Sequence, residues 1–173
     1  EVYIETLQKH GVLGTIKHFP GHGNTVCDTF IETCSVGLTE EVYRERDLVP
    51  FIRSLQHNPK FVMVGLFSTP YDPGVISIHS KKVVTDLLRD KLGYDGIVIT
   101  DDYMMGAVKD IDRDTLTLQA LEAGADMFLT TNAEDVPLIY EALLQGVKEG
   151  KVSEERIDVS FGRVLKVKKE YFG

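Results

Sequence analysis

The chain has 173 residues, of which 43% are apolar and 27% charged, and its formal net charge is −8. This balance describes an ordinary soluble globular domain with one substantial core, and the acidic excess argues against a nucleic-acid surface. No apolar run approaches the roughly 18 residues that a membrane span needs.

The first predicted strand-then-helix unit follows an amphipathic opening helix. The opening residues EVYIETLQKHG show no basic stretch followed by an apolar one, so no signal peptide is expected in them. A strand is predicted over residues 12–18, and a Gly/Pro-rich loop then leads to a helix over residues 38–56. Thr39 is the expected N-cap of this helix, because its hydroxyl can accept a backbone hydrogen bond.

The second unit starts with FVMVGLF, residues 61–67, whose continuous apolar run predicts a buried strand. A helix is predicted over residues 81–93, with Ser80 as its cap and Gly93 as its stop.

The third unit is GYDGIVITDDYMMGAV, residues 93–108, which predicts a turn, a short buried strand and an acidic pair. Asp101 and Asp102 follow the strand at its carboxyl end, where parallel α/β folds place their chemistry. An acidic pair in this place can also cap the next helix or line a turn. A second stretch, KHFPGHG at residues 17–23, likewise closes an apolar run.

The fourth unit combines a strand over residues 125–131 with a helix over 134–150, and a last helix begins at a serine N-cap. Four such units demand parallel strands with right-handed crossovers, so the predicted fold class is α/β. An open doubly wound sheet or part of a (β/α)8 barrel would fit. A full barrel takes about 250 residues, so four units make about half of one. KHFPGHG matches no glycine-rich nucleotide motif.

The cysteines and histidines imply no metal and no cofactor, because they lack ligand spacing. Cys27 and Cys34 form a single C-x6-C pair without a supporting cluster, and free thiols are expected there rather than a disulfide. The cellular compartment stays open.

Several stretches taken together resemble glycoside hydrolase family 3, and within it the β-N-acetylhexosaminidase branch. The matching segments are KHFPGHGNTVCD, VMVG, VVTDLLRDKLGYDG, ITDDYMMGAV, LEAGADMFL and RVLKVK. They follow the family's order over residues 1–173, and the PGHG continuation points to N-acetylglucosaminides. The resemblance implies one partial catalytic domain, the carboxyl-terminal half of a (β/α)8 barrel.

The resemblance also implies roles for individual residues. Asp101 matches the nucleophile of a retaining glycosidase, which forms a covalent glycosyl-enzyme that water then opens. Asp102 would face the scaffold. Lys17 and His18 match residues that hydrogen-bond the sugar, and Met104 can line the sugar site.

The chain departs from the family pattern at the proton donor. The usual Asp-x-His pair, whose histidine acts as general acid and base, corresponds to Asp28 and Phe30. Asp28 is therefore carried over as a catalytic residue, but phenylalanine cannot transfer a proton, a function worth roughly 10²–10⁴-fold in rate. Asn24 replaces the usual aspartate, and Leu66 replaces a histidine. His79 lies where it could substitute, although a lone histidine before a helix is more often structural.

Three functional interpretations follow. The preferred one is a retaining β-N-acetylglucosaminidase, with the activity of this piece alone left open. The alternatives are a carbohydrate-binding pseudoenzyme and a phosphate-binding or other small-molecule module unrelated to sugars. The expected partner is a carbohydrate, with no nucleic acid and no membrane. Because half a barrel leaves strand edges and an apolar interior exposed, a second copy of the chain or the missing amino-terminal half is also expected. A stable monomer would count against this.

Overall fold

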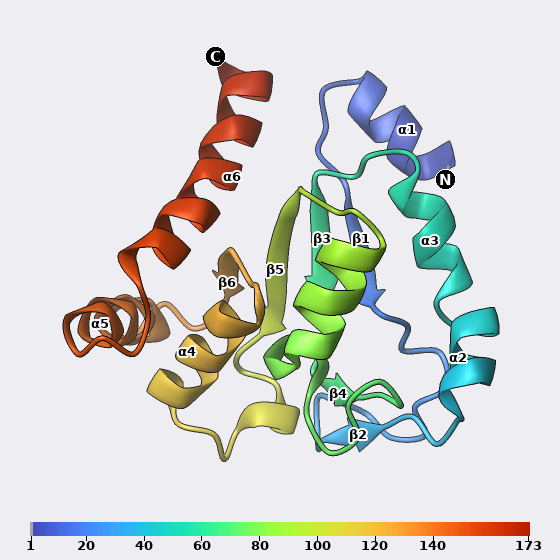
Figure 1. Cartoon of the computed structure of the whole chain (residues 1–173), viewed down its shortest axis with the longest axis horizontal. Helices are drawn as coiled ribbons and strands as arrows, with labels where there is room; N and C mark the ends of the chain where they lie inside the picture. The colour runs from blue at the N-terminus through green and yellow to red at the C-terminus, as the bar shows by residue number, and fades with distance from the viewer. Residues whose placement is uncertain (1) are drawn as a thin grey trace.

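The computed structural model describes residues 2–173 and is built on a parallel sheet (Figure 1). In spatial order, its strands are β1 (Thr15–Phe19), β3 (Phe61–Val64), β5 (Ile97–Asp102) and β6 (Met127–Leu129). Every neighbouring pair is parallel, which confirms the predicted α/β class. A second, two-stranded parallel sheet pairs β2 (Cys34–Ser35) with β4 (Phe67–Ser68).

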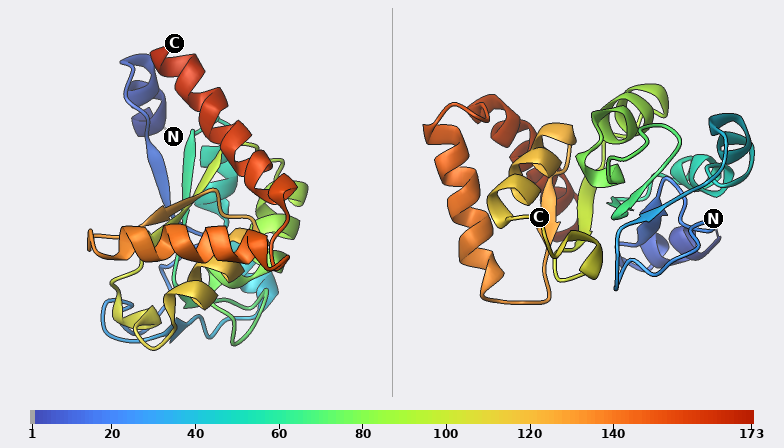
Figure 2. Two further views of the ribbon diagram at one scale, coloured as in Figure 1. Left: turned by 90° about the vertical axis from the view of Figure 1, so that its left-hand side faces the viewer. Right: turned by 90° about the horizontal axis from the view of Figure 1, so that it is seen from below.

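Helices form an arc around the four-stranded sheet (Figure 2). They are α1 (Val2–Lys9), α2 (Glu40–Arg46), α3 (Val49–Leu55), η2 (Lys82–Lys91), α4 (Arg113–Ala123), α5 (Asp135–Lys148) and α6 (Glu154–Phe172). Two single turns, η1 (Ser77–His79) and η3 (Gly106–Val108), complete the order. No helix within residues 2–173 is both long enough and apolar enough to cross a membrane.

The expected helix signals are present where local chemistry predicts them. The hydroxyl of Thr39 accepts a hydrogen bond from the backbone N–H of Val42, and Ser153 caps α6 in the same way. Gly93 has a φ of +69°, a left-handed conformation that glycine adopts without steric cost and that ends η2.

Two predictions were wrong in detail. The single helix expected over residues 38–56 is two helices, α2 and α3, with Pro50 in the first turn of α3. Proline lacks a backbone N–H and clashes with the preceding turn, so it kinks or breaks a helix, and here the helix is broken. The predicted strand over 61–67 ends at Val64, and the chain continues into the separate strand β4.

The two faces of the four-stranded sheet differ in burial. Ile16, Val62 and Val98 lie side by side in the strand register and are buried beneath the helices. On the opposite face, five apolar residues stay partly exposed. They are Phe61, Met63, Ile99, Met127 and Leu129. One face of the sheet therefore packs into the core, while the other remains open.

Candidate active site

Asp101 stands at the carboxyl end of β5, an interior strand of the sheet. Asp101 is only 8% exposed, and its Oδ1 accepts a hydrogen bond from the backbone N–H of Asp102 at 2.9 Å. The buried run that precedes it fixes the carboxylate at the end of the sheet where parallel α/β folds carry out chemistry.

His18 brings a second polar group to Asp101. It lies near the end of β1, and its Nε2 is 3.4 Å from Oδ2 of Asp101. Burial lowers the pKa of His18, with Lys17 and His22 acting in the same direction, while Asp101 opposes the shift. The imidazole is therefore neutral near pH 7, and the contact joins a neutral ring to a carboxylate rather than forming an ion pair.

A glycine makes this meeting possible, because β3 lies between β1 and β5. A Cβ added at Gly65, just after β3, would lie 2.2 Å from the Phe67 ring and 3.3 Å from the Cβ of His18. Such crowding would displace these side chains, so the absence of a side chain at Gly65 leaves room for His18. The peptide bonds Lys17–His18 and Phe19–Pro20 are cis.

Asp102 is tied to the scaffold instead. Its carboxylate accepts hydrogen bonds from the hydroxyl and backbone N–H of Thr131, at 2.7 and 3.0 Å, and from the backbone N–H of Met104 at 3.0 Å. Burial would raise the pKa of Asp102, but these hydrogen bonds lower it below the ordinary value. The two adjacent aspartates thus have different environments.

The predicted sugar-binding residues Lys17 and Met104 are both exposed. Met104 is 49% exposed, and Arg113 approaches its sulfur through Nη2 at 3.7 Å. Neither side chain is hydrogen-bonded to Asp101 or His18. Lys17 adjoins His18 in the sequence, and Met104 lies three residues after Asp101.

The structure does not bring Asp28 into contact with Asp101. Asp28 is exposed, and its Oδ1 accepts a hydrogen bond from the backbone N–H of Phe30 at 2.9 Å. Its backbone carbonyl accepts two more, from Ile31 and Glu32. In this arrangement Asp28 shapes a turn, and Phe30 stands at the tip of that turn.

The loop that carries Asp28 is closed by a disulfide between Cys27 and Cys34, whose Cα atoms are 5.8 Å apart. The expectation of free thiols was therefore wrong. The loop doubles back on itself, with Thr25 and Val36 paired in an antiparallel bridge, and this brings the two cysteines together. Their spacing in the sequence carries no sign of that turn.

Two further histidines have structural partners. The ring nitrogens of His22 contact the hydroxyls of Thr25 and Thr29. The Nε2 of His79 lies 3.2 Å from the carbonyl oxygen of Leu116 on α4, and burial lowers its pKa against the opposing effect of that contact. His79 is thus engaged with a helix outside the sheet.

The other departures are also accommodated locally. Asn24 donates a hydrogen bond from its Nδ2 to Oδ1 of Asp47, which holds the loop against α2. Leu66 is fully buried in the main core, where a histidine would have to lose its hydration.

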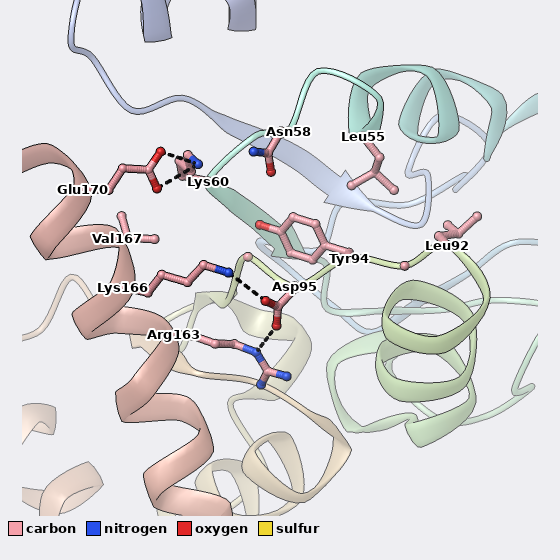
Figure 3. Close-up of a pocket in the computed structure, with 12 residues that line it drawn as sticks. Leu55, Asn58, Lys60, Leu92, Tyr94, Asp95, Arg163, Lys166, Val167 and Glu170 are labelled. Carbon is pink, nitrogen blue, oxygen red and sulfur yellow. Dashed lines mark hydrogen bonds and ion pairs between the residues drawn. The ribbon is translucent and has the colours of Figure 1, made fainter.

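A pocket at the opposite end of the sheet offers no comparable chemistry (Figure 3). It lies at the amino ends of β3 and β5, and its charged side chains are engaged in ion pairs. Lys60 pairs with Glu170 at 2.9 Å, while Lys166 and Arg163 pair with Asp95 at 3.0 and 3.4 Å. Within residues 2–173, no group of three or more histidine, cysteine or acidic side chains is arranged to hold a metal ion.

Known proteins match the chain along nearly its whole length. The family model described as "Glycosyl hydrolase family 3 N terminal domain" covers residues 1–167. A β-N-acetylglucosaminidase/β-glucosidase of Cellulomonas fimi is 29% identical, over 96% of this chain and 31% of that protein. The β-hexosaminidase LpqI of Mycobacterium tuberculosis is 32% identical, over 96% of this chain and 44% of that protein.

The solved structures agree with the sequence relatives. A family 3 β-N-acetylglucosaminidase from Paenibacillus sp. superposes with a TM-score of 0.91 and 35% identity, covering 96% of this chain and 32% of that one. The chain thus spans less than half the length of these relatives. Its parallel sheet is the one found in that family's barrel-like catalytic domain.

Proposed function

The chain belongs to glycosyl hydrolase family 3, and we propose that the protein hydrolyses terminal β-N-acetylglucosaminides with retention of anomeric configuration. The observation that carries the proposal is Asp101, fixed at the carboxyl end of β5 with His18 3.4 Å away. The names of the relatives, β-N-acetylglucosaminidase and β-hexosaminidase, support the choice of sugar.

In the proposed reaction, Asp101 acts as the nucleophile. One of its carboxylate oxygens attacks the anomeric carbon, the bond from that carbon to the aglycone oxygen breaks, and a glycosyl ester forms on Asp101. Water then attacks the same carbon, the ester bond breaks, and the free carboxylate returns. Two displacements at one carbon restore the original configuration.

The residues beside Asp101 bind the sugar in this proposal. His18 is neutral, so one of its ring nitrogens carries a proton and can donate to a sugar hydroxyl. Lys17 is exposed, and its ammonium group offers three donors to the same ligand. Met104 supplies an apolar wall at the edge of the site.

Proton transfer to the leaving group is the weak part of the site. Asp28 is retained from the expected dyad, but Phe30 stands where its histidine would be. We therefore propose that glycosides with good leaving groups react and that those requiring a protonated leaving group react slowly. Phe30 also favours a second candidate function, a carbohydrate-binding protein without turnover.

The open face of the sheet bears on the active form of the protein. Five apolar side chains remain partly exposed there, although such surfaces are normally covered in soluble proteins. We propose that further polypeptide, either a second copy of the chain or an amino-terminal half of the barrel, covers this face and completes the sugar site. Activity is therefore best measured on the full-length protein.

The test compares an activated aryl β-N-acetylglucosaminide with an unactivated disaccharide of the same sugar, using wild-type protein, Asp101→Asn and the control Asp90→Asn. Asp90 is exposed on η2, away from the site. We expect aryl glycoside cleavage in the wild type and in Asp90→Asn, and a loss of roughly 10³-fold or more in Asp101→Asn. If the wild type binds the sugar but cleaves neither substrate, the binding protein is the better account.

A further inference from the structure

The tip of the disulfide-closed loop exposes large apolar side chains. Phe30 is 72% exposed and Ile31 is 66% exposed. Phenylalanine and isoleucine are mostly buried in soluble proteins, and an exposed group of them often marks a binding surface. We call Phe30, Ile31 and the nearby Met104 the apolar rim.

The backbone beneath this rim is held firmly. The Cys27–Cys34 disulfide closes the loop, and two backbone N–H groups of the segment after β5 donate hydrogen bonds to its carbonyl oxygens. Gly106 donates to the carbonyl of Phe30 at 3.1 Å, and Ala107 donates to the preceding carbonyl at 3.0 Å. A Cβ added at Gly106 would lie 2.4 Å from the carbonyl oxygen of Ile31, so the two segments touch closely.

The same contacts attach the loop to the segment that follows the proposed nucleophile in the chain. Gly106 and Ala107, which donate to the loop, follow Asp101 in the same segment, and Met104 lies between Asp101 and Gly106. A second connection runs from the other side, because the Thr29 hydroxyl contacts His22, whose ring lies 5.9 Å from that of His18. The loop therefore contacts the segment after Asp101 and, through His22, a neighbour of His18.

A fixed apolar surface at this place suits one kind of ligand. The group that leaves the anomeric carbon must lie next to the sugar, at the edge of the site. Neither Phe30 nor Ile31 can give that group a proton, so the leaving groups that suit this loop are those that depart without one, such as phenols. Phenols are also aromatic, and an aromatic ring packs favourably on the face or edge of phenylalanine.

We propose that the apolar rim binds the aromatic aglycone of the substrate, with Phe30 as the residue that determines this specificity. The inference rests on the proposed function and names its substrate class, namely aryl β-N-acetylglucosaminides. The backbone contacts and the disulfide hold Phe30 in place before the ligand arrives, so little ordering of the loop opposes binding.

The test uses thioglycosides, which resist hydrolysis and so report binding alone. Dissociation constants of phenyl and methyl 1-thio-β-N-acetylglucosaminide are measured with the full-length protein by calorimetry. We expect the phenyl compound to bind about tenfold more tightly, as partial burial of one aromatic ring would give. This ratio falls to near one in Phe30→Ala and is retained in Phe30→Tyr.

Phe161→Ala serves as the matched control, because Phe161 is an exposed phenylalanine on α6. It leaves the ratio at its wild-type value. A wild-type ratio near one, or a ratio that survives Phe30→Ala, overturns the aglycone site while sugar binding still stands. If neither thioglycoside binds, the proposed function itself fails, and the inference fails with it.

Discussion

Two aspartates at opposite ends of one sheet have contrasting environments. Asp126 immediately precedes β6 and has a fully buried side chain, whereas Asp101 lies near the carboxyl end of β5 and retains some exposure. The carboxylate of Asp126 accepts hydrogen bonds from Arg89, Arg163, Ser160 and the backbone N–H of Val98. The side chain of Asp101 has His18 at 3.4 Å and one backbone donor.

The contrast separates stability from chemistry. A carboxylate whose oxygens are already bound by arginines has no lone pair directed at a ligand, so Asp126 holds helices η2 and α6 against the sheet. Within residues 2–173, each carboxylate oxygen of Asp101 has only one polar neighbour, so lone pairs remain free to contact a ligand. The amino end of the sheet thus stabilises the fold and the carboxyl end carries the proposed reaction, as in other parallel α/β folds.

The largest effect on the free energy of unfolding is expected from Asp126→Asn. Removing the charge leaves buried arginines without their partner, which costs about 3–5 kcal/mol of unfolding free energy. The control is Asp95→Asn, since Asp95 also pairs with Arg163 but is exposed, and exposed pairs contribute less than about 1 kcal/mol. Urea denaturation with an unchanged m-value measures both. Equal losses in the two variants would contradict the account.

His18→Gln should show the opposite pattern at the other end of the sheet. In the proposed function the half-buried imidazole binds the sugar, so we expect kcat/KM for an aryl glycoside to fall about tenfold to a hundredfold. Thermal stability should change little. The control is His10→Gln, because His10 is exposed and precedes β1 in the chain. A large drop in stability with unchanged kcat/KM would assign His18 to the scaffold.

The smallest effect concerns the response of stability to pH. Burial lowers the pKa of His79 in the folded protein below its ordinary value of 6.5. As pH falls through 6.5, the unfolded chain therefore takes up a proton before the folded one does, and stability is lost. We expect the melting temperature to decline between pH 7 and pH 5 and the decline to be shallower in His79→Gln. An identical decline in both proteins would remove His79 as a cause.

Local chemistry made much of this fold predictable from sequence. The apolar run before Asp101 identified β5, and hydroxyl caps such as Thr39 and Ser153 marked where helices begin. Pro50 was a signal of the same kind, and it correctly implies the break between α2 and α3 that the apolar pattern concealed.

Contacts between distant residues could not be predicted in this way. The hydrogen bonds to Asp126 come from residues of η2, β5 and α6, and the sequence near Asp126 does not indicate which arginines are its partners. The Cys27–Cys34 disulfide depends on a loop that doubles back. The approach of His18 to Asp101 across β3 depends on the space left at Gly65.

The central claim is that Asp101 forms a covalent bond to the sugar. The direct measurement is mass spectrometry of the full-length protein after incubation with a 5-fluoro β-N-acetylglucosaminyl fluoride, because the ring fluorine slows hydrolysis of the glycosyl-enzyme. We predict an increase by one glycosyl unit on the peptide that contains Asp101, and no increase in Asp101→Asn. An adduct on another residue, or turnover that releases the inverted anomer, would contradict the account.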